Sequence, residues 1–311
     1  MSSQEFQGRA LRLFGQATLR LNEPMSGHTS FRIGGPALFF ATPTDVPTLR
    51  SLLAFCCAEG LPWFVLGFGT NLLVADAGYR GMVIHLRRGW ESLHVSGTGM
   101  EVGAGHSLPK LARKAAEAGL SGLEFAAGIP GSVGGALAMN AGAFGGCMAD
   151  AVRRADCLTP DRGEVSLNAA EMAFAYRHSR ILDEPLIVTR AHLALKPDER
   201  QTILRRMEEF QAQRKTRQPW SARSAGSVFR NPPGDAAGRL IEAAGCKGLR
   251  VGGALVSPKH ANFIVNAGGA TAADVLALLR EVQRRVREQS GVRLEPEITL
   301  LGEFEAQTAP Q

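Results

Sequence analysis

Two serines in a short glycine-bearing segment are the first residues whose type and spacing could carry chemistry. Ser224 and Ser227 lie three residues apart in SAGSVFRNPPG, and Gly226 stands directly before the second serine. A serine beside a glycine can shape a turn, contact a phosphate or use its hydroxyl as a catalytic acid. A nucleophilic serine would need an adjacent base, and the segment contains no histidine. The residues alone leave the other roles open.

Three glycine-rich segments form a second group of candidate binding residues. They are residues 31–36 (FRIGGP), 66–73 (LGFGTNLL) and 128–136 (GIPGSVGGA). Glycines let successive backbone N–H groups turn toward an anion, and serine, threonine and asparagine add further donors. None of the segments is the G-x-G-x-x-G of a dinucleotide-binding turn or the GK[ST] of a P-loop. Any one of them could be a plain turn, but together they favour a large phosphate-bearing cofactor held by loops.

The helices and strands that must position these segments follow from the hydrophobic periodicity. Apolar residues at helical spacing predict helices, and short apolar runs predict strands. We expect helices at 45–60, 108–118, 197–217, 236–244 and 271–289. We expect strands at 63–66, 82–86, 101–105, 151–158, 164–167, 186–195, 250–256 and 261–266, and a last one after Glu297. The composition of the sequence changes near residue 195, and this change divides the chain into a glycine-rich portion and a smaller α/β portion.

The composition indicates a loop-rich α/β protein with a sizeable core. The chain has 311 residues, 45% of them hydrophobic, with 36 glycines and 16 prolines. The net charge of +6 suits an anionic ligand, but the basic residues are dispersed, so nucleic acid is not expected as a partner. We interpret the basic cluster at 214–217 as solvated surface. Five cysteines without a CxxC pair, no signal peptide and no membrane-spanning run predict a cytoplasmic protein without disulfides or a metal site.

Longer motifs resemble one enzyme family over almost the whole chain. LGFGTNLLVAD, followed by GIPGSVGGALAMNAGAFG, resembles the FAD-binding half of the UDP-N-acetylenolpyruvoylglucosamine reductase family. HTSFRIGGPA, AYRHS, SAGSVFRNPPG, SPKHANFIVN and LEPEI resemble further motifs of that family in the same order, between Met25 and Leu301. The resemblance implies an α+β fold, with a vanillyl-alcohol-oxidase-type FAD-binding domain of two α/β subdomains and a C-terminal α/β substrate-binding domain.

The resemblance also implies domain boundaries and a subtype. We expect an N-terminal extension at 1–24, an FAD-binding domain at 25–195 (subdomains 25–92 and 93–195) and a substrate-binding domain at 196–311. One subtype of the family carries an extra tyrosine-bearing loop that folds over the substrate. Here the chain passes from Arg177 to Leu186 directly into LIVTRAHLAL, and its only tyrosines are Tyr79 and Tyr176. The shorter subtype is therefore expected.

The reaction that the resemblance implies belongs to peptidoglycan precursor synthesis. NADPH would reduce non-covalently bound FAD, and flavin N5 would pass the hydride to the alkene of UDP-N-acetylglucosamine enolpyruvate, yielding UDP-N-acetylmuramate. Hydride addition to an unsaturated carboxylate builds negative charge on the carboxylate, so a fixed cation or acid is needed there. A further acid must protonate the neighbouring carbon. A monomer is expected, and no motif distinguishes NADPH from NADH.

Three residues match the catalytic groups that this chemistry requires. Arg177 matches the arginine that would hold the carboxylate through its planar fork, although read alone it is a surface arginine. Glu297 matches the glutamate that would assist the enolate, and the neighbouring Glu295 is the residue most easily mistaken for it. Ser227 matches the serine that would donate the proton, which requires its conjugate base to be stabilised. Ser224 then returns to a role in the turn.

The resemblance assigns cofactor and substrate contacts as well. The residues that would hold FAD are Arg32, Ile33, Gly34, Gly67, Gly69, Thr70, Asn71, Gly131, Ser132, Gly134 and Gly135. The residues that would bind substrate are Tyr176, Lys215, Arg217, Asn231 and His260. The choice between Lys215 and Arg217 for the substrate phosphates stays open, and for His260 the favoured alternative is a hydrogen-bonded structural histidine.

Two other function classes compete with this interpretation. A flavin oxidase of the same cofactor fold would explain the glycine-rich segments but not the joint presence of Arg177, Ser227 and Glu297. A catalytically silent nucleotide-sugar or flavin-binding module would not need those three residues at all. A basic nucleic-acid binder is the weakest alternative, because no recognition motif is present.

Overall fold

A computed structural model describes residues 3–304, and the chain within it divides into two compact units. The first unit comprises 1–20, 40–68 and 82–216, and the second comprises 21–39, 69–81 and 217–311. The parts of residues 1–2 and 305–311 in these ranges lie outside the described residues. The domain boundaries expected at 25, 93 and 196 stay a prediction, and the compact units divide the chain at other places.

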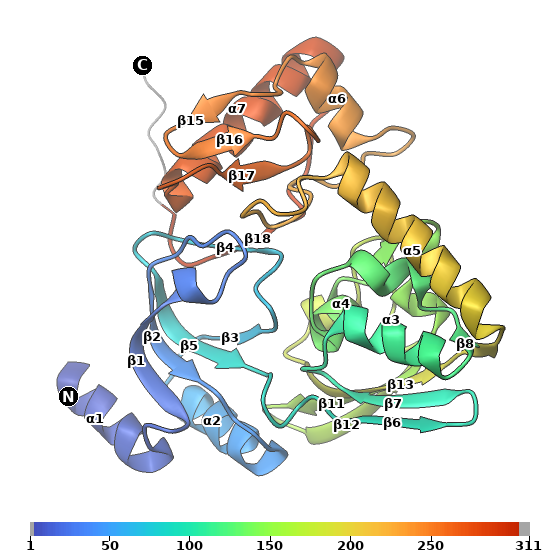
Figure 1. Cartoon of the computed structure of the whole chain (residues 1–311). Coiled ribbons are helices and arrows are strands. Elements are labelled where there is room, and N and C mark those ends of the chain that lie inside the picture. Colours follow the sequence, from blue (N-terminus) through green and yellow to red (C-terminus); the bar gives the residue numbers. More distant parts are fainter. Residues whose placement is uncertain (1–2, 305–311) are drawn as a thin grey trace. The chain divides into compact units, whose positions relative to one another are not determined.

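A four-stranded sheet has the strand order β1-β2-β5-β3 (Figure 1). β3 pairs with β5 in parallel, from Trp63 opposite Met82 to Leu66 opposite His85. The strands are β1 (Leu19–Pro24), β2 (Pro36–Ala41), β3 (Trp63–Leu66) and β5 (Tyr79–His85). The strand predicted at 63–66 is thus confirmed, whereas β1 and β2 lay outside the predicted elements.

Two helices belong to the N-terminal part of the first unit. α2 (Val46–Ala58) begins after Asp45, whose side chain accepts a hydrogen bond from the Thr48 amide over 2.8 Å, and the predicted helix at 45–60 is confirmed. α1 (Ser3–Phe14) was not predicted. Its Phe6 stacks on Phe55 of α2 at 5.7 Å between ring centroids, so tertiary contact supports this helix.

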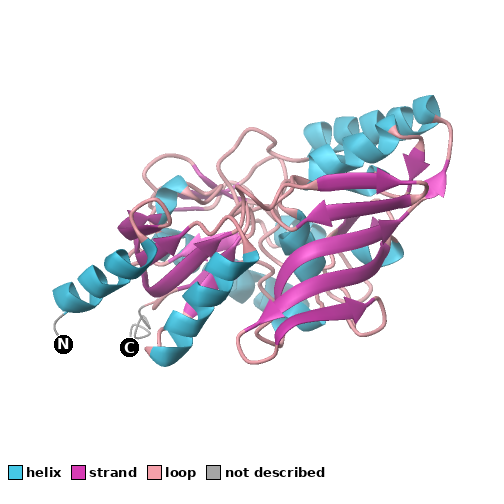
Figure 2. Cartoon of the chain, turned by 90° about the horizontal axis from the view of Figure 1, so that it is seen from below, coloured by secondary structure: helices cyan, strands magenta, loops and turns pink. Residues whose placement is uncertain are grey.

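The larger sheet of the first unit has five antiparallel strands in the order β12-β11-β13-β7-β6. Figure 2 shows these strands side by side. They are β6 (Leu93–Ser96), β7 (Gly99–Gly103), β11 (Val152–Thr159), β12 (Gly163–Asn168) and β13 (Ile187–Ala194). Four of them confirm the predicted strands at 101–105, 151–158, 164–167 and 186–195 within one to two residues.

Helices and short strands complete the first unit. The predicted helix at 108–118 is α3 (Leu108–Glu117), and the one at 197–217 is α5 (Arg200–Arg217), which starts three residues later. α3 and α5 lie beside each other in Figure 1. The remaining elements are α4 (Val133–Ala138), the 3-10 helices η2 (Glu124–Gly128), η3 (Met148–Asp150) and η4 (Arg180–Leu182), and the short strands β8 (Leu120–Ser121), β9 (Gly142–Ala143), β10 (Gly146–Cys147) and β14 (Lys196–Pro197).

The second unit packs two helices with a small antiparallel sheet in the order β15-β16-β17. α7 starts after Thr271, whose hydroxyl and the Asp274 carboxylate form a capping box, and it confirms the helix predicted at 271–289. A parallel pair, β4 with β18, joins residues 72–74 to 299–301. The elements are η1 (Met25–Gly27), β4 (Leu72–Val74), α6 (Ala237–Ala243), β15 (Arg250–Val251), β16 (Ala254–Val256), β17 (Ile264–Asn266), α7 (Ala272–Ser290) and β18 (Thr299–Leu301).

Two strand predictions in the second unit need correction. The strand expected at 250–256 is a hairpin of β15 and β16, because Gly252 takes a positive φ of 51° and reverses the chain. The strand expected at 261–266 begins only at Ile264, because residues 260–263 form a turn in which the Phe263 amide donates to the His260 carbonyl oxygen.

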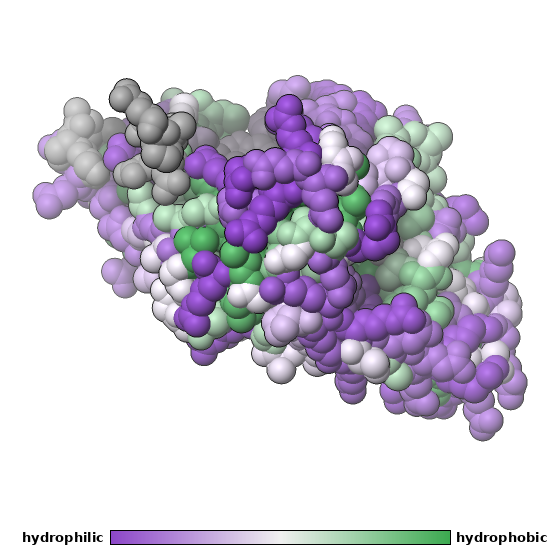
Figure 3. Space-filling view, turned by 90° about the horizontal axis from the view of Figure 1, so that it is seen from above, coloured by the Kyte–Doolittle hydropathy of each residue, from purple (hydrophilic) through white to green (hydrophobic). Residues whose placement is uncertain are grey.

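The fold class is α+β, as predicted, with helices and mostly antiparallel sheets in both units. All five cysteines are free. Polar side chains cover most of the face in Figure 3, and apolar ones lie among them. Within residues 3–304, no helix combines the length and the apolar character needed to cross a membrane.

Candidate active site

Ser227 lies in a short extended segment of the second unit. Gly226 has a φ of 77°, a conformation that favours glycine, and it turns the chain directly before the serine. Ser227 then forms an isolated antiparallel bridge with Phe263. The carbonyl oxygen of Ser224 accepts a hydrogen bond from Ser30 Oγ over 2.6 Å, so Ser224 anchors the turn. These contacts agree with a turn role for Ser224 and hold Ser227 in one position.

Asn262 fixes the residues that follow Ser227. Its Oδ1 accepts from the Phe229 amide over 3.0 Å, and its Nδ2 donates to the Phe229 carbonyl oxygen over 2.8 Å. Its own carbonyl oxygen accepts from the Val228 amide over 2.9 Å. Asn262 is 3% exposed and Phe229 is 1% exposed, so these bonds satisfy backbone groups that water does not reach.

Glu297 is held beside the same segment. Its amide donates to the Val228 carbonyl oxygen over 2.8 Å, and its carbonyl oxygen accepts from Asn71 Nδ2 over 3.1 Å. Glu297 is half-buried whereas Glu295 is exposed, and the Glu295 carbonyl oxygen pairs with the Arg230 amide. The structure therefore places two of the three predicted catalytic residues, Ser227 and Glu297, in neighbouring backbone segments, and Glu297 is more buried than Glu295.

Arg177 belongs to the first unit and has a strained backbone. Its φ is 55°, a left-handed conformation that costs a residue with a Cβ about 1 kcal/mol or more. Its Nη1 donates to the Gly142 carbonyl oxygen over 3.2 Å, and its guanidinium lies 5.2 Å from the Tyr176 ring centroid. Tyr176 is 53% exposed. The nearby Asn140, Phe144 and Ala173 also have positive φ values, so strain gathers around this arginine.

Two predicted cofactor segments approach each other within the first unit. A Cβ at Gly67 would lie 2.2 Å from Ser132 Oγ, so a larger residue would displace the Ser132 hydroxyl from its present position. Ser132 is the N-cap of α4 and accepts from the Gly135 amide over 3.3 Å, which leaves its hydroxyl hydrogen able to donate. Gly134 donates its amide to the Ala104 carbonyl oxygen over 2.8 Å, and Gly131 has a φ of 157°.

The other predicted cofactor residues lie together in the second unit. The Ser30 amide donates to the Gly69 carbonyl oxygen over 3.0 Å, and a Cβ at Gly69 would lie 2.1 Å from the His28 carbonyl oxygen. Arg32 has a φ of 57°, and Ile33 is 3% exposed. This contact sets the first and second glycine-rich segments, with Gly34, Thr70 and Asn71, side by side.

The donor set in these segments fits the diphosphate of FAD. A diphosphate needs several backbone N–H and hydroxyl donors spread over both phosphates, together with backbones free of Cβ atoms. The close approach of Gly67 to Ser132 supplies a hydroxyl beside a backbone without a side chain. Whether each predicted residue contacts the cofactor stays a prediction.

The predicted substrate residues have mixed surroundings. Lys215 and Arg217 are both exposed at the end of α5. Asn231 uses its Oδ1 to accept from the Ala237 amide over 3.0 Å at the start of α6. His260 Nδ1 accepts from the Asn262 amide over 3.2 Å, and its ring meets Phe263 edge-on at 5.0 Å. Burial lowers the pKa of His260, and the positive charge of Lys247 adds to this, so both favour the neutral imidazole.

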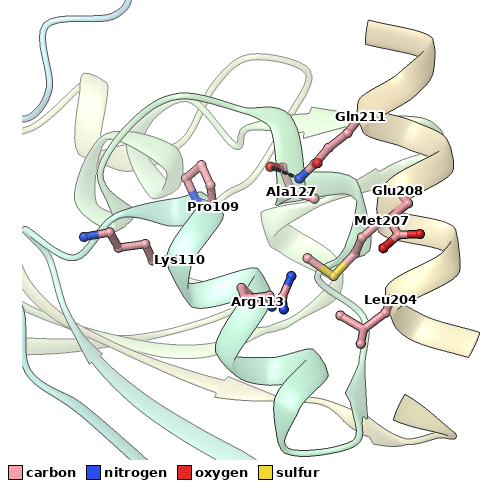
Figure 4. A pocket seen from close by; sticks show the side chains of 8 residues that line it. All are labelled: Pro109, Lys110, Arg113, Ala127, Leu204, Met207, Glu208 and Gln211. Atoms are coloured by element: carbon pink, nitrogen blue, oxygen red, sulfur yellow. Dashed lines mark hydrogen bonds between the residues drawn. The ribbon is translucent and has the colours of Figure 1, made fainter. Parts of the chain in front are cut away.

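The first unit contains a groove of about 240 Å³ (Figure 4). Its lining contains none of the predicted site residues and comes from α3, η2 and α5: Pro109, Lys110, Arg113, Ala127, Leu204, Met207, Glu208 and Gln211. Among residues 3–304, no cluster of histidine, cysteine, aspartate or glutamate is arranged to hold a metal ion.

Sequence reasoning missed two residues, Asn262 and Arg214, whose side chains bind the backbone of the predicted site segments. Asn262 is the polar residue that interrupts the apolar run ANFIVN, and this interruption was the available signal. Arg214 was interpreted as part of a solvated basic cluster, and that interpretation is wrong for this residue. Its Nη1 donates to the Gly128 carbonyl oxygen over 2.9 Å and its Nε is buried, whereas Lys215 and Arg217 are exposed.

Two family models match the chain. The model of the UDP-N-acetylenolpyruvoylglucosamine reductase C-terminal domain matches residues 218–301, and that of the FAD binding domain matches residues 37–167. The first match contains Ser227 and Glu297, and the second contains two of the three glycine-rich segments.

Relatives extend the similarity to nearly the full length. The chain is 51% identical to UDP-N-acetylenolpyruvoylglucosamine reductase of Heliobacterium modesticaldum over 90% of each chain. It is 46% identical to the enzyme of that name from Caldanaerobacter subterraneus, over 93% of this chain and 95% of the relative. The crystal structure of UDP-N-acetylenolpyruvylglucosamine reductase from Thermus caldophilus is similar with a TM-score of 0.79 at 42% identity, covering 91% of this chain and 98% of that one. The chain belongs to the UDP-N-acetylenolpyruvoylglucosamine reductase family.

Proposed function

We propose that this protein reduces UDP-N-acetylglucosamine enolpyruvate to UDP-N-acetylmuramate, with NADPH as reductant and FAD as non-covalent cofactor. Relatives bearing the name of this reductase match it at 43–51% identity over about 90% of its length. The observation that carries the proposal is the backbone pairing of Val228 with Glu297, which sets the candidate proton donor and the candidate enolate-stabilising acid in adjacent extended segments. Neither an oxidase nor a silent binding module requires this pairing.

Each catalytic residue has one task in the proposed reaction. FAD, when bound, supplies the hydride that reaches the alkene. Arg177 binds the carboxylate with its planar fork and opposes the negative charge that builds there. Glu297 stabilises the enolate, and Ser227 donates the proton from its Oγ to the carbon beside the carboxylate. The fixed backbone on both sides of Ser227 limits the positions that its hydroxyl can reach, which lowers the entropic part of the barrier.

The cofactor would be held by the residues of the three glycine-rich segments. Backbone amides at glycine and the hydroxyl of Ser132 are donors suited to the diphosphate. The residues assigned to this task are Arg32, Ile33, Gly34, Gly67, Gly69, Thr70, Asn71, Gly131, Ser132, Gly134 and Gly135. Tight burial of Ile33 and the left-handed φ of Arg32 support a shaped binding surface at 32–34.

The substrate nucleotide would be bound by exposed polar groups. Tyr176 offers an exposed ring and hydroxyl next to Arg177, and Lys215 or Arg217 offers a cation to the phosphates. Asn231, whose side-chain Oδ1 accepts from the Ala237 amide at the start of α6, is proposed to contact the diphosphate. His260 has structural contacts that already account for it, and its substrate role is the weakest of the set. The chain runs from Arg177 through η4 into β13 without an inserted loop, as in the shorter subtype.

We further propose a monomeric protein of the cytoplasm without nucleic acid or membrane partners. Its substrates are then UDP-N-acetylglucosamine enolpyruvate and NADPH. The free cysteines agree with a reducing compartment.

The first test is the visible spectrum and the substrate dependence of NADPH oxidation. Purified protein should be yellow or take up FAD, and it should oxidise NADPH rapidly only when the enolpyruvyl sugar is present. A colourless protein that ignores FAD would exclude any flavoenzyme, and NADPH oxidation indifferent to the sugar would point to an oxidase.

Rapid kinetics of Ser227→Ala test the mechanism. The variant should accept electrons from NADPH almost normally, while its reoxidation by substrate should slow by about 10²- to 10⁴-fold, the range for loss of an acid catalyst. Ser224→Ala is the matched control and should reoxidise like the wild type. A defect in Ser224→Ala in place of Ser227→Ala would refute the assignment of the proton donor.

A further inference from the structure

The guanidinium of Arg214 is fixed at the start of the third glycine-rich segment. Arg214 Nη1 donates to the Gly128 carbonyl oxygen over 2.9 Å. One turn earlier on α5, Gln211 Nε2 donates to the Ala127 carbonyl oxygen over 3.1 Å (Figure 4). Residues three apart share a helix face, so both side chains reach the end of η2. Arg214 is therefore held against residues 128–136 and does not extend into solvent.

No carboxylate of residues 3–304 neutralises this cation. Arg214 Nε is buried and has no hydrogen-bond partner within the described part of the chain. Burial, together with the positive charge of Arg177, lowers the pKa of Arg214 to about 10, so the group is still protonated at neutral pH. A partly buried charge without an anionic partner is costly, and a bound anion would offset this cost.

Arg177 and Arg214 meet the same short segment of the first unit. Arg177 Nη1 donates to the Gly142 carbonyl oxygen, and the Arg214 guanidinium lies 5.8 Å from the ring centroid of Phe144. Phe144 in turn stacks on Phe210 of α5, with 4.4 Å between centroids and 2° between planes. Arg177 and Phe144 both have positive φ values, 55° and 52°. Strained residues therefore keep two cations around one segment, as is typical of a ligand site.

We infer that Arg214 is a second cationic contact for the substrate carboxylate and shares that anion with Arg177. The inference rests on the proposed function. A carboxylate has two oxygens that accept several charge-assisted hydrogen bonds, so two guanidinium groups can bind it without competition. Two fixed cations also oppose the charge that develops on the carboxylate during hydride addition. Arg214 thus acts as a residue that binds and orients the enolpyruvyl group.

The test compares two ligands that differ by the carboxylate. Binding of UDP-N-acetylglucosamine enolpyruvate and of UDP-N-acetylglucosamine to the oxidised FAD-loaded protein is measured by calorimetry, without NADPH. Arg214→Met should weaken binding of the enolpyruvyl ligand by about 10- to 100-fold, the range for a lost hydrogen bond to a charged group. It should change binding of UDP-N-acetylglucosamine by less than about twofold. Arg205→Met, an exposed arginine of the same helix, is the control and should change neither.

Several outcomes would overturn the inference. Equal weakening of both ligands, or of neither, would show that Arg214 does not contact the carboxylate. Slower flavin reduction by NADPH with unchanged ligand selectivity would assign Arg214 to the cofactor. If Arg214→Met does not fold, Arg214→Lys and Arg214→Gln give the same comparison, with a smaller loss expected for the lysine, which keeps the charge but not the fork. A wild-type protein that fails to bind the enolpyruvyl ligand would refute the proposed function itself.

Discussion

Replacement of Asn262 by alanine separates the support of the catalytic segment from its chemistry. Asn262 contacts the backbone of Phe229 twice, through Oδ1 at 3.0 Å and Nδ2 at 2.8 Å. The side chain is buried, and Phe229 is 1% exposed. Alanine removes both bonds, while the backbone bond from the Val228 amide to the residue 262 carbonyl oxygen can persist. The Phe229 N–H and C=O groups are then left without partners.

The expected loss of stability in Asn262→Ala follows from the N–H and C=O groups of Phe229. Each buried backbone group without a partner destabilises a protein by about 1–3 kcal/mol, so Asn262→Ala should lower the free energy of unfolding by about 2–6 kcal/mol. Entry of a water molecule into the vacated space would bring the loss toward the lower end. Because Ser227 lies directly before Val228, the same change should slow reoxidation of the reduced enzyme by substrate and leave reduction by NADPH nearly unchanged.

Urea unfolding followed by circular dichroism measures the first effect, and rapid kinetics measure the second. Arg280→Ala, which truncates an exposed side chain of α7, serves as the control and should stay within about 0.5 kcal/mol of the wild type. An Asn262→Ala variant as stable as Arg280→Ala would refute the view that the asparagine satisfies buried backbone groups. Slowing of both half-reactions equally would refute its specific effect on Ser227.

Two further predictions concern the first unit. Gly67→Ala should destabilise the protein because the new Cβ would lie 2.2 Å from Ser132 Oγ. Adding Ser132→Gly should restore part of the lost stability, since glycine in place of the N-cap serine costs only a few tenths of a kcal/mol. Thermal unfolding of the wild type, the two single variants and the double variant measures this coupling, and additive effects of the two substitutions would contradict it. Glu124 is 8% exposed; burial by itself raises its pKa, but hydrogen bonds from Gly122, Ser121 and Arg206 outweigh it and hold the pKa below the usual 4.5. The carboxylate therefore contributes stability above pH 4.5 that is lost as the pH falls through the lower pKa of the folded state. The difference in unfolding free energy between wild type and Glu124→Gln should accordingly shrink in acid, and a difference that is constant from pH 7 to pH 3 would refute the assignment.

Local sequence was sufficient for the regular elements that carry their own signals. The helices predicted to begin at Asp45 and Thr271 are capped by these residues, because a side-chain oxygen at that position satisfies the first free amides whatever the rest of the chain does. β3 and β13 follow their apolar runs to within a residue. The hairpin at 250–256 was missed because the Gly252-Gly253 turn interrupts an otherwise continuous apolar pattern. α1 was missed because its support comes from Phe55, far along the chain.

The residue types and motifs by themselves determined the family, the chemistry and the names of the candidate residues. The tertiary structure decided which of those residues meet, since contact depends on pairings between segments far apart in sequence. The Val228–Glu297 hydrogen bond puts Ser227 and Glu297 in neighbouring backbone segments, whereas Glu295 is exposed. The sequence did not show which basic residues are buried. Arg214 and Lys215 are neighbours in one basic run, yet on α5 Arg214 faces η2 and Lys215 faces solvent. A helix rotates successive residues by about 100°, so adjacent arginine and lysine can have opposite environments, and only packing selects which of them is buried.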